Sequence, residues 1–168
     1  MNGLSKEYTI RKAVPEDAKA IADIDAACFP GGEAADLSLV EEKIRSLQQH
    51  FFVTCFGEQI VNYLNGTCNN SRDLTAEIDE DPDLNDPDGE WMHFLGMATL
   101  PEHRGKGIAE AVMSTAIAQA KEEGRKGCVL NCKDHLVAYY EKHFGYVNEG
   151  NIGNTCHGVR WNQMRLTF

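Results

Sequence analysis

The sequence predicts an α/β fold in which strands and helices alternate around a mixed sheet. Three observations support this prediction. The 168 residues, of which 42% are hydrophobic, suit one domain over residues 1–168. Segments of alternating polarity, such as 8–13, are followed by segments with helical spacing of apolar residues. The run at 90–100 is nearly continuously apolar, which is typical of a central strand covered on both faces.

In the first half of the chain, the spacing of apolar residues predicts two helices and three strands. After the strand at 8–13, residues 14–29 show helical spacing with Pro15 at the start. A second helix is expected at about 36–49. Residues 50–68 read as two strands joined at Gly57, which indicates a hairpin.

The second half gives the clearest helix, at residues 105–123, where apolar residues recur at helical spacing up to Gly124. The remaining expected elements are a buried strand at 127–133, a helix at 135–144 and terminal strands at 145–150 and 159–168. No internal repeat is visible. The terminal strand has an apolar side that suits either the core or a homodimer contact.

Acidic residues concentrate at 77–90, which contains eight of the 26 acidic residues and two prolines. This composition predicts an exposed, mobile loop. A calcium site is the alternative, because four of these side chains fit an EF-hand spacing, but Leu84 stands where that loop needs glycine. The formal net charge of −10 argues against nucleic acid as a partner and is compatible with cationic small molecules.

Six cysteines are scattered along the chain without a Cys-x-x-Cys pair. We therefore expect small buried thiols and no metal site. The chain has no apolar run of membrane-spanning length, and its first residues lack the apolar segment of a secretory signal. These features predict a cytoplasmic protein.

The stretch at 100–112, LPEHRGKGIAEAV, places glycines and cations between a strand and a helix. Amides at a helix start are unpaired and lie at the positive end of the helix dipole, so this turn predicts a phosphate site. Gly105 and Gly107 allow close backbone approach or a positive φ, and Arg104 and Lys106 add charge. The spacing matches neither a Walker loop nor a dinucleotide fingerprint, which needs glycine where Glu110 stands.

Arg104-x-x-Gly107-x-Ala109 resembles the Arg/Gln-x-x-Gly-x-Gly/Ala signature of the GNAT acetyltransferase superfamily. The apolar strand before it, the long helix after it and YYEKHFGY downstream extend the resemblance over nearly the whole chain. It implies a GNAT-like fold with a mostly antiparallel sheet flanked by helices, and acetyl-CoA as the acetyl donor. The loop amides would surround the pyrophosphate and the preceding strand would follow the pantetheine arm. The implied cofactor-binding residues are Leu95, Gly96, Met97, His103, Arg104, Gly105, Lys106, Gly107, Ile108 and Ala109.

Within the superfamily, the sequence is most similar to the serotonin (arylalkylamine) N-acetyltransferases. WMHFLGM keeps the second strand histidine of that group as His93 and has Trp91 in place of the first. HLVAYY is similar to the segment that carries the general-acid tyrosine, which implies that role for Tyr140. The sequence departs from the group at 33–39, EAADLSL, where the group carries an amine-pocket segment, and by one extra residue before Gly145.

The chemistry of the residues agrees with this resemblance. An alkylamine is protonated at neutral pH, so acyl transfer needs a base, and His93 is the histidine expected in the buried strand. The amide of Leu95 would stabilise the oxyanion, and Tyr140 would protonate the CoA thiolate. The non-catalytic alternatives are that His93 is a core histidine hydrogen-bonded to a carbonyl oxygen, and that Tyr140 only packs against the sheet. Tyr139 and Tyr146 are the other candidates for the acid role.

The sequence therefore predicts an enzyme that transfers acetyl from acetyl-CoA to a primary amine by direct attack in a ternary complex. The expected acceptor is a small arylalkylamine or a polyamine-like molecule. A peptide or protein amine and a non-catalytic CoA-binding module are the alternatives.

Overall fold

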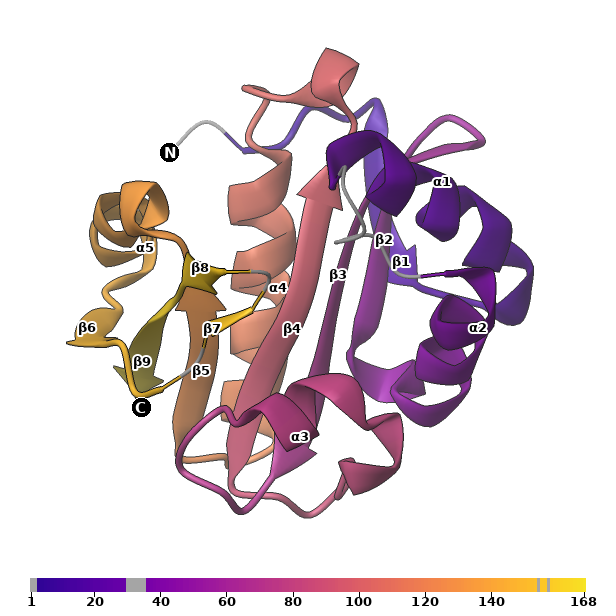
Figure 1. Cartoon of the computed structure of the whole chain (residues 1–168). Helices are drawn as coiled ribbons and strands as arrows, with labels where there is room; N and C mark the ends of the chain where they lie inside the picture. The colour runs from indigo at the N-terminus through magenta and orange to yellow at the C-terminus, as the bar shows by residue number, and fades with distance from the viewer. Residues whose placement is uncertain (1–2, 30–35, 154, 157) are drawn as a thin grey trace. The chain divides into compact units, whose positions relative to one another are not determined.

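The structure is a computed structural model that describes residues 3–29, 36–153, 155–156 and 158–168 (Figure 1). Contacts between Cα atoms divide the chain into two compact units. The first unit contains residues 1–65 and 96–116, and the second contains residues 66–95 and 117–168. Each unit is described by itself.

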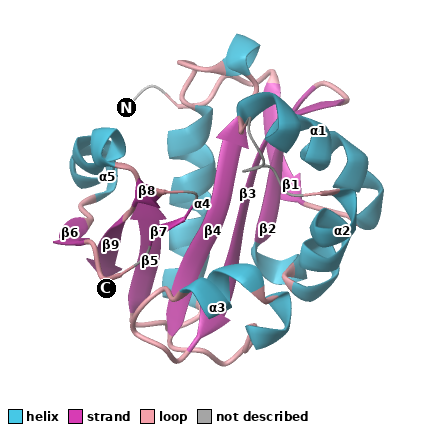
Figure 2. Cartoon of the chain, viewed as in Figure 1, coloured by secondary structure: helices cyan, strands magenta, loops and turns pink. Residues whose placement is uncertain are grey.

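Figure 2 shows the helices and strands of the chain. The α-helices are α1 (Ala18–Cys28), α2 (Leu37–Ser46), α3 (Ala76–Glu80), α4 (Ile108–Glu122) and α5 (Val137–Phe144). The strands are β1 (Tyr8–Lys12), β2 (Phe51–Phe56), β3 (Gln59–Asn69), β4 (Trp91–Thr99), β5 (Gly127–Cys132), β6 (Val147–Gly150), β7 (Thr155–Cys156), β8 (Val159–Arg160) and β9 (Asn162–Thr167).

In the first unit, β2 pairs antiparallel with β1 on one side and with β3 on the other. The β2–β3 hairpin turns at Gly57, whose φ is 59°, as the sequence predicts. Helices α1 and α2 lie side by side (Figure 1), and α2 is capped by Asp36, whose side chain accepts a hydrogen bond from the Leu39 amide. Buried residues such as Ile21, Ile44 and Val53 form the core of this unit.

In the second unit, β4 runs parallel to β5, and β9 pairs antiparallel with both β5 and β6. The β5–β9 ladder extends along the whole of β5, from Gly127 to Cys132. The β4–β5 ladder is shorter and ends at the pair His93–Val129. Beyond this pair, the edge of β5 that faces β4 is no longer hydrogen-bonded to it.

These elements confirm the predicted α/β fold class with a mixed, mostly antiparallel sheet. Helix α4 begins at Ile108 rather than 105, because Gly105 and Gly107 have positive φ values that a helix does not contain. The predicted strand at 159–168 is interrupted at Trp161. Its second part, β9, is paired along both edges. The extent of the domain, residues 1–168, stays a prediction, and so does a homodimer.

The acidic segment 77–90 is more ordered than the sequence predicts. It contains most of α3, which Thr75 caps by accepting a hydrogen bond from the Ile78 amide. Asp81 caps the following 3-10 turn in the same way. The guanidinium of Arg125 donates hydrogen bonds to the carbonyl oxygens of Pro87 and Gly89. The segment is mostly exposed, as predicted, but it is not a loop throughout, because local caps and Arg125 hold two short helical turns and the residues after them.

Within the described part of the chain, no helix combines the length and apolar character needed to cross a membrane.

Candidate active site

The turn between β4 and α4 has the backbone shape that the glycine pattern predicts. Gly105 has a φ of 74° and Gly107 a φ of 83°, in the left-handed region that favours glycine. A Cβ at either position would meet no atom within 4 Å, so the backbone angle, not crowding, requires glycine. The first helical hydrogen bond runs from the Ala111 amide to the Gly107 carbonyl oxygen at 3.1 Å. The preceding amides at the start of α4 lack helical partners and point out of the helix end.

Cationic side chains accompany this turn. Arg104 and Lys106 are exposed. The Arg104 Nε donates to the carbonyl oxygen of Thr99 at 3.1 Å, and its Nη2 lies 3.5 Å from Cys28 Sγ. These contacts keep the guanidinium beside the turn. The first unit thus supplies free amides and positive charge at one place, which is the chemistry of a phosphate site.

His103, at the start of this turn, is half-buried. Its Nδ1 lies 2.8 Å from the hydroxyl oxygen of Tyr8. Its ring also packs against Tyr8 and Phe56 at centroid distances of 5.7 and 5.2 Å. The side chain of His103 is therefore part of an aromatic cluster, in which its Nδ1 is engaged by Tyr8.

Leu95, Gly96 and Met97 form a half-buried stretch of β4 between the buried Phe94 and Ala98. A Cβ on Gly96 would lie 3.2 Å from the hydroxyl oxygen of Tyr63. Tyr63 cannot easily yield, because its hydroxyl is hydrogen-bonded to the buried Asp25 on α1.

His93 is fully buried in β4, with 0% of its surface exposed. Its Nε2 donates a hydrogen bond to the carbonyl oxygen of Ser71 at 2.9 Å, which leaves the lone pair on Nδ1. Nδ1 has no hydrogen-bond partner among the residues that the structure describes. Burial lowers the pKa of His93 to about 4, although the bond to Ser71 opposes this shift, and nearby Arg165 adds to it. The imidazole is therefore neutral near pH 7.

Tyr140 lies on α5 and is also buried. Its ring packs against Tyr146, Phe144 and Tyr139 at centroid distances of 5.8, 6.1 and 5.2 Å. Burial raises the pKa of its hydroxyl well above the usual value, and the nearby Cys132 adds to this effect. The hydroxyl is therefore a proton donor at neutral pH.

The second unit places His93 and Tyr140 on opposite faces of β5. His93 is paired with Val129, and paired residues share a face. Cys132 lies near enough to Tyr140 to raise the pKa of its hydroxyl. It is an odd number of residues from Val129 on β5, so its side chain lies on the opposite face of the strand. A substrate that contacts both side chains therefore has to cross the edge of β5 beyond its last pair with β4.

A buried polar network beside His93 is a feature that sequence reasoning missed. Arg165 on β9, 3% exposed, donates hydrogen bonds to Asp73, to Glu149 and to the Arg72 carbonyl oxygen. Its guanidinium carbon also lies 4.8 Å from the centroid of the Trp91 ring. The network fixes the segment that accepts the His93 hydrogen bond. Its sequence signal was the pair of polar residues at alternate positions, 163 and 165, which a strand places on the same face.

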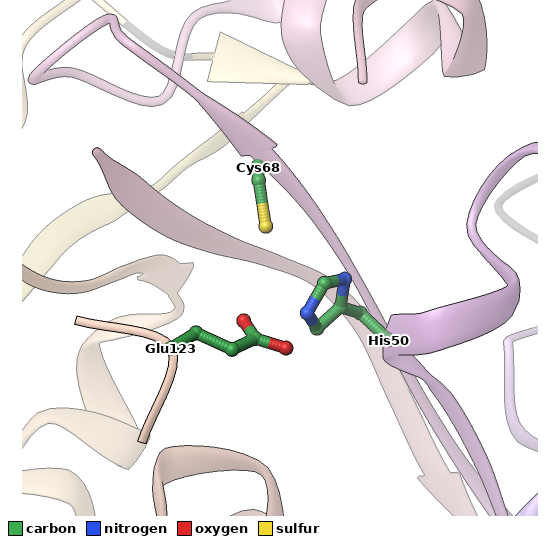
Figure 3. Close-up of side chains that lie close together, drawn as sticks. All are labelled: His50, Cys68 and Glu123. Carbon is green, nitrogen blue, oxygen red and sulfur yellow. The ribbon is translucent and has the colours of Figure 1, made fainter. Parts of the chain in front are cut away.

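Cys68 and Glu123, both in the second unit, turn their sulfur and carboxylate ends toward each other (Figure 3, which also labels His50 of the first unit). Burial raises the pKa of the Cys68 thiol to about 12. Arg125 donates a hydrogen bond to Glu123 at 2.7 Å. At neutral pH this thiol is protonated and the carboxylate is paired, so the two groups are poorly suited to hold a metal.

A glycine turn with unpaired amides at a helix start is typical of a site that binds a phosphate-containing cofactor, and comparisons with known proteins identify the family. Residues 18–146 match the model of the acetyltransferase (GNAT) family. The chain belongs to this family. A comparison with curated protein sequences gives no match.

Solved structures show the same fold at low sequence identity. The loading GNATL domain of CurA from Lyngbya majuscula is 12% identical, with a TM-score of 0.82 over 95% of this chain and 97% of that one. Ard1 from Thermoplasma volcanium is 18% identical, with a TM-score of 0.76 over 96% and 97%. The putative acetyltransferase yncA from Salmonella typhimurium, solved with acetyl-CoA, is 16% identical, with a TM-score of 0.71 over 96% and 94%.

The family match confirms the resemblance to the GNAT superfamily and the prediction that the protein is an N-acetyltransferase. The similarity to the serotonin (arylalkylamine) group is not tested at this level. The cofactor-binding and catalytic roles of individual residues stay predictions. Residues 33–35 of the divergent 33–39 segment lie outside the described residues.

The buried state of His93 predicts acid sensitivity. The pKa of His93 is about 4 in the folded protein and near 6.5 in the unfolded chain. Its contribution to the free energy of unfolding is therefore fully present above pH 6.5 and falls as the pH decreases toward 4. The loss from this group is roughly 3 kcal/mol across the window. Urea denaturation of the wild type and of His93→Gln between pH 7 and pH 4 measures it. A variant that loses as much stability on acidification as the wild type would contradict this origin.

Proposed function

We propose that this acetyltransferase takes acetyl from acetyl-CoA and transfers it to a primary amine by direct attack in a ternary complex. The observation that carries the proposal is the turn at Gly105 and Gly107, which leaves unpaired amides at the start of α4 beside two cations. A pyrophosphate fits this chemistry. The acetyl-CoA found with the similar yncA structure supports the choice of donor.

The pantetheine arm would follow β4 at Leu95, Gly96 and Met97, the half-buried part of the strand. Because the β4–β5 ladder ends after His93, backbone groups beyond this point are available to a ligand. The thioester would lie near Leu95, whose amide can stabilise the oxyanion that forms on the carbonyl oxygen.

The reaction balances with two side chains. The amine nitrogen attacks the thioester carbonyl carbon, a C–N bond forms and the C–S bond breaks. The proton that leaves nitrogen is accepted at Nδ1 of His93, and Tyr140 gives its proton to the departing thiolate. With a pKa of about 4, His93 accepts the proton only briefly and passes it to solvent. The hydrogen bond to Ser71 fixes the tautomer that leaves Nδ1 open.

For the acceptor we propose a small primary amine, and the resemblance to the arylalkylamine group makes arylalkylamines and polyamines the first compounds to assay. The likeness of His93 and Tyr140 to the arylalkylamine group supports this choice. Trp91, which replaces the first histidine of that group, is buried and stacked with Arg165, so it supplies no second base. A peptide amine is the second candidate, because the similar structures include a ribosomal-protein-S18-alanine N-acetyltransferase from Escherichia coli.

Gly107→Val is expected to weaken acetyl-CoA binding about tenfold or more, because a branched side chain disfavours the φ of 83° that presents the amides. Gly124→Val is the matched control, since Gly124 has a φ of 77°, equally open surroundings and a place at the other end of α4. Isothermal titration calorimetry measures both affinities. Equal losses in the two variants would show that strain, not a loop contact, is responsible.

Turnover is tested by release of CoA thiol with a panel of arylalkylamines, polyamines and peptides at millimolar concentration. Tyr140→Phe is expected to lower kcat by about 100-fold if it supplies the leaving-group proton. Tyr139→Phe, which alters the neighbouring ring, is the control and should retain activity. Tight CoA binding without turnover on any amine would reject the enzyme and favour a non-catalytic CoA-binding module.

A further inference from the structure

Three buried polar atoms in the second unit lack hydrogen-bond partners in the described parts of the chain. They are Nδ1 of His93, Oδ1 of Asn131 and Nε1 of Trp161. The proposed reaction uses only the first. A buried polar atom without a partner costs free energy, so each such atom in a folded protein requires an explanation.

Strand register places His93 and Asn131 on one face of the second unit. His93 is paired with Val129, and Asn131 is two residues further along β5, so it shares that face. Asn131 is paired with Gln163 on β9, and Trp161 comes directly before β9 begins. The Nζ of Lys133, which follows β5, lies 5.4 Å from the centroid of the Trp161 ring, so the indole lies near this end of β5.

The position along the strands is equally informative. Asn131 comes after the last β4–β5 pair, on the part of β5 that β4 no longer covers. This is the place to which the proposed mechanism brings the thioester, on the side of the sheet that carries His93. An acceptor that approaches Nδ1 of His93 from this face meets Asn131 and then Trp161.

The other two atoms, Oδ1 of Asn131 and Nε1 of Trp161, need opposite kinds of hydrogen-bond partner. An amide oxygen accepts hydrogen bonds, whereas an indole N–H only donates one. A ligand that satisfies both needs an N–H group and, a few bonds away, an oxygen that accepts a hydrogen bond. The positive charge of Lys133 over the indole ring strengthens the preference for a carbonyl or carboxylate oxygen there.

We propose that Asn131 and Trp161 bind the acceptor, and that its class is an amine with a nearby carbonyl or carboxylate oxygen, as in amino acids, their amides and peptide N-termini. This inference rests on the proposed acetyl transfer. Asn131 Oδ1 accepts a hydrogen bond from the amine nitrogen and directs its lone pair, while Trp161 Nε1 donates to the oxygen. Polyamines and simple arylalkylamines lack that oxygen and leave the indole N–H unpaired.

The test uses glycinamide and isobutylamine, which have the same shape and differ in the amide. Each is titrated into the protein loaded with CoA, which lacks an acetyl group, so that binding is measured without turnover. Trp161→Phe should weaken glycinamide binding about tenfold and leave isobutylamine binding unchanged. Phe168→Leu, which alters an exposed aromatic side chain of the second unit, is the control and should change neither.

Asn131→Leu should weaken both ligands, because it removes the acceptor for the amine, and Asn131→Asp should retain or tighten both. Equal binding of the two amines to the wild type, or an equal effect of Trp161→Phe on both, would overturn the inference. The outcome is separate from the proposed function. Binding that discriminates as expected without thiol release from any amine would reject acetyl transfer and keep the acceptor site.

Discussion

The early end of the parallel ladder between β4 and β5 is the constraint on which the rest of the second unit depends. Backbone pairing stops at His93–Val129, while β5 continues to Cys132 with β9 on its other edge. Because β9 holds β5 along its whole length, the loss of one neighbour does not unravel the strand. The part of the β5 edge that is not paired with β4 therefore does not destabilise the strand, and its backbone groups remain available for hydrogen bonds to a ligand that has amide groups of its own.

The polar groups around this edge are fixed before any ligand arrives. Arg165 and Gln163 on β9 hold Asp73 and Glu149. Asp73 belongs to the segment 71–74, in which the carbonyl oxygen of Ser71 accepts a hydrogen bond from Nε2 of His93. A histidine held in this way has one tautomer and one orientation. The non-catalytic interpretation of His93, a core histidine hydrogen-bonded to a carbonyl oxygen, therefore describes Nε2 correctly, while Nδ1 remains available for proton transfer.

Whether the sequence predicts a feature depends on how far apart along the chain the residues that determine it lie. The glycine turn at 105–107 and the hairpin at Gly57 are set by a few neighbouring residues, and both were predictable. The site at Asn131 and Trp161 depends on the pairing of β5 with β9 across about 30 residues, which no local pattern reveals. The low pKa of His93 results from burial by the 71–74 segment and Arg165, which likewise needs the fold.

The low pKa of His93 also bears on the acceptor. His93, with a pKa of about 4, is a weak base, so the reaction depends on the fraction of the amine that is already deprotonated, and this fraction is small for an ordinary alkylammonium, whose pKa is near that of lysine, about 10.4. An amine next to a carbonyl group has a pKa of roughly 8, so a larger fraction is already deprotonated at neutral pH. The electrostatics of His93 and the unpaired indole of Trp161 thus favour the same acceptors by independent arguments. A weak base is sufficient when the substrate itself brings the electron-withdrawing oxygen that the indole binds.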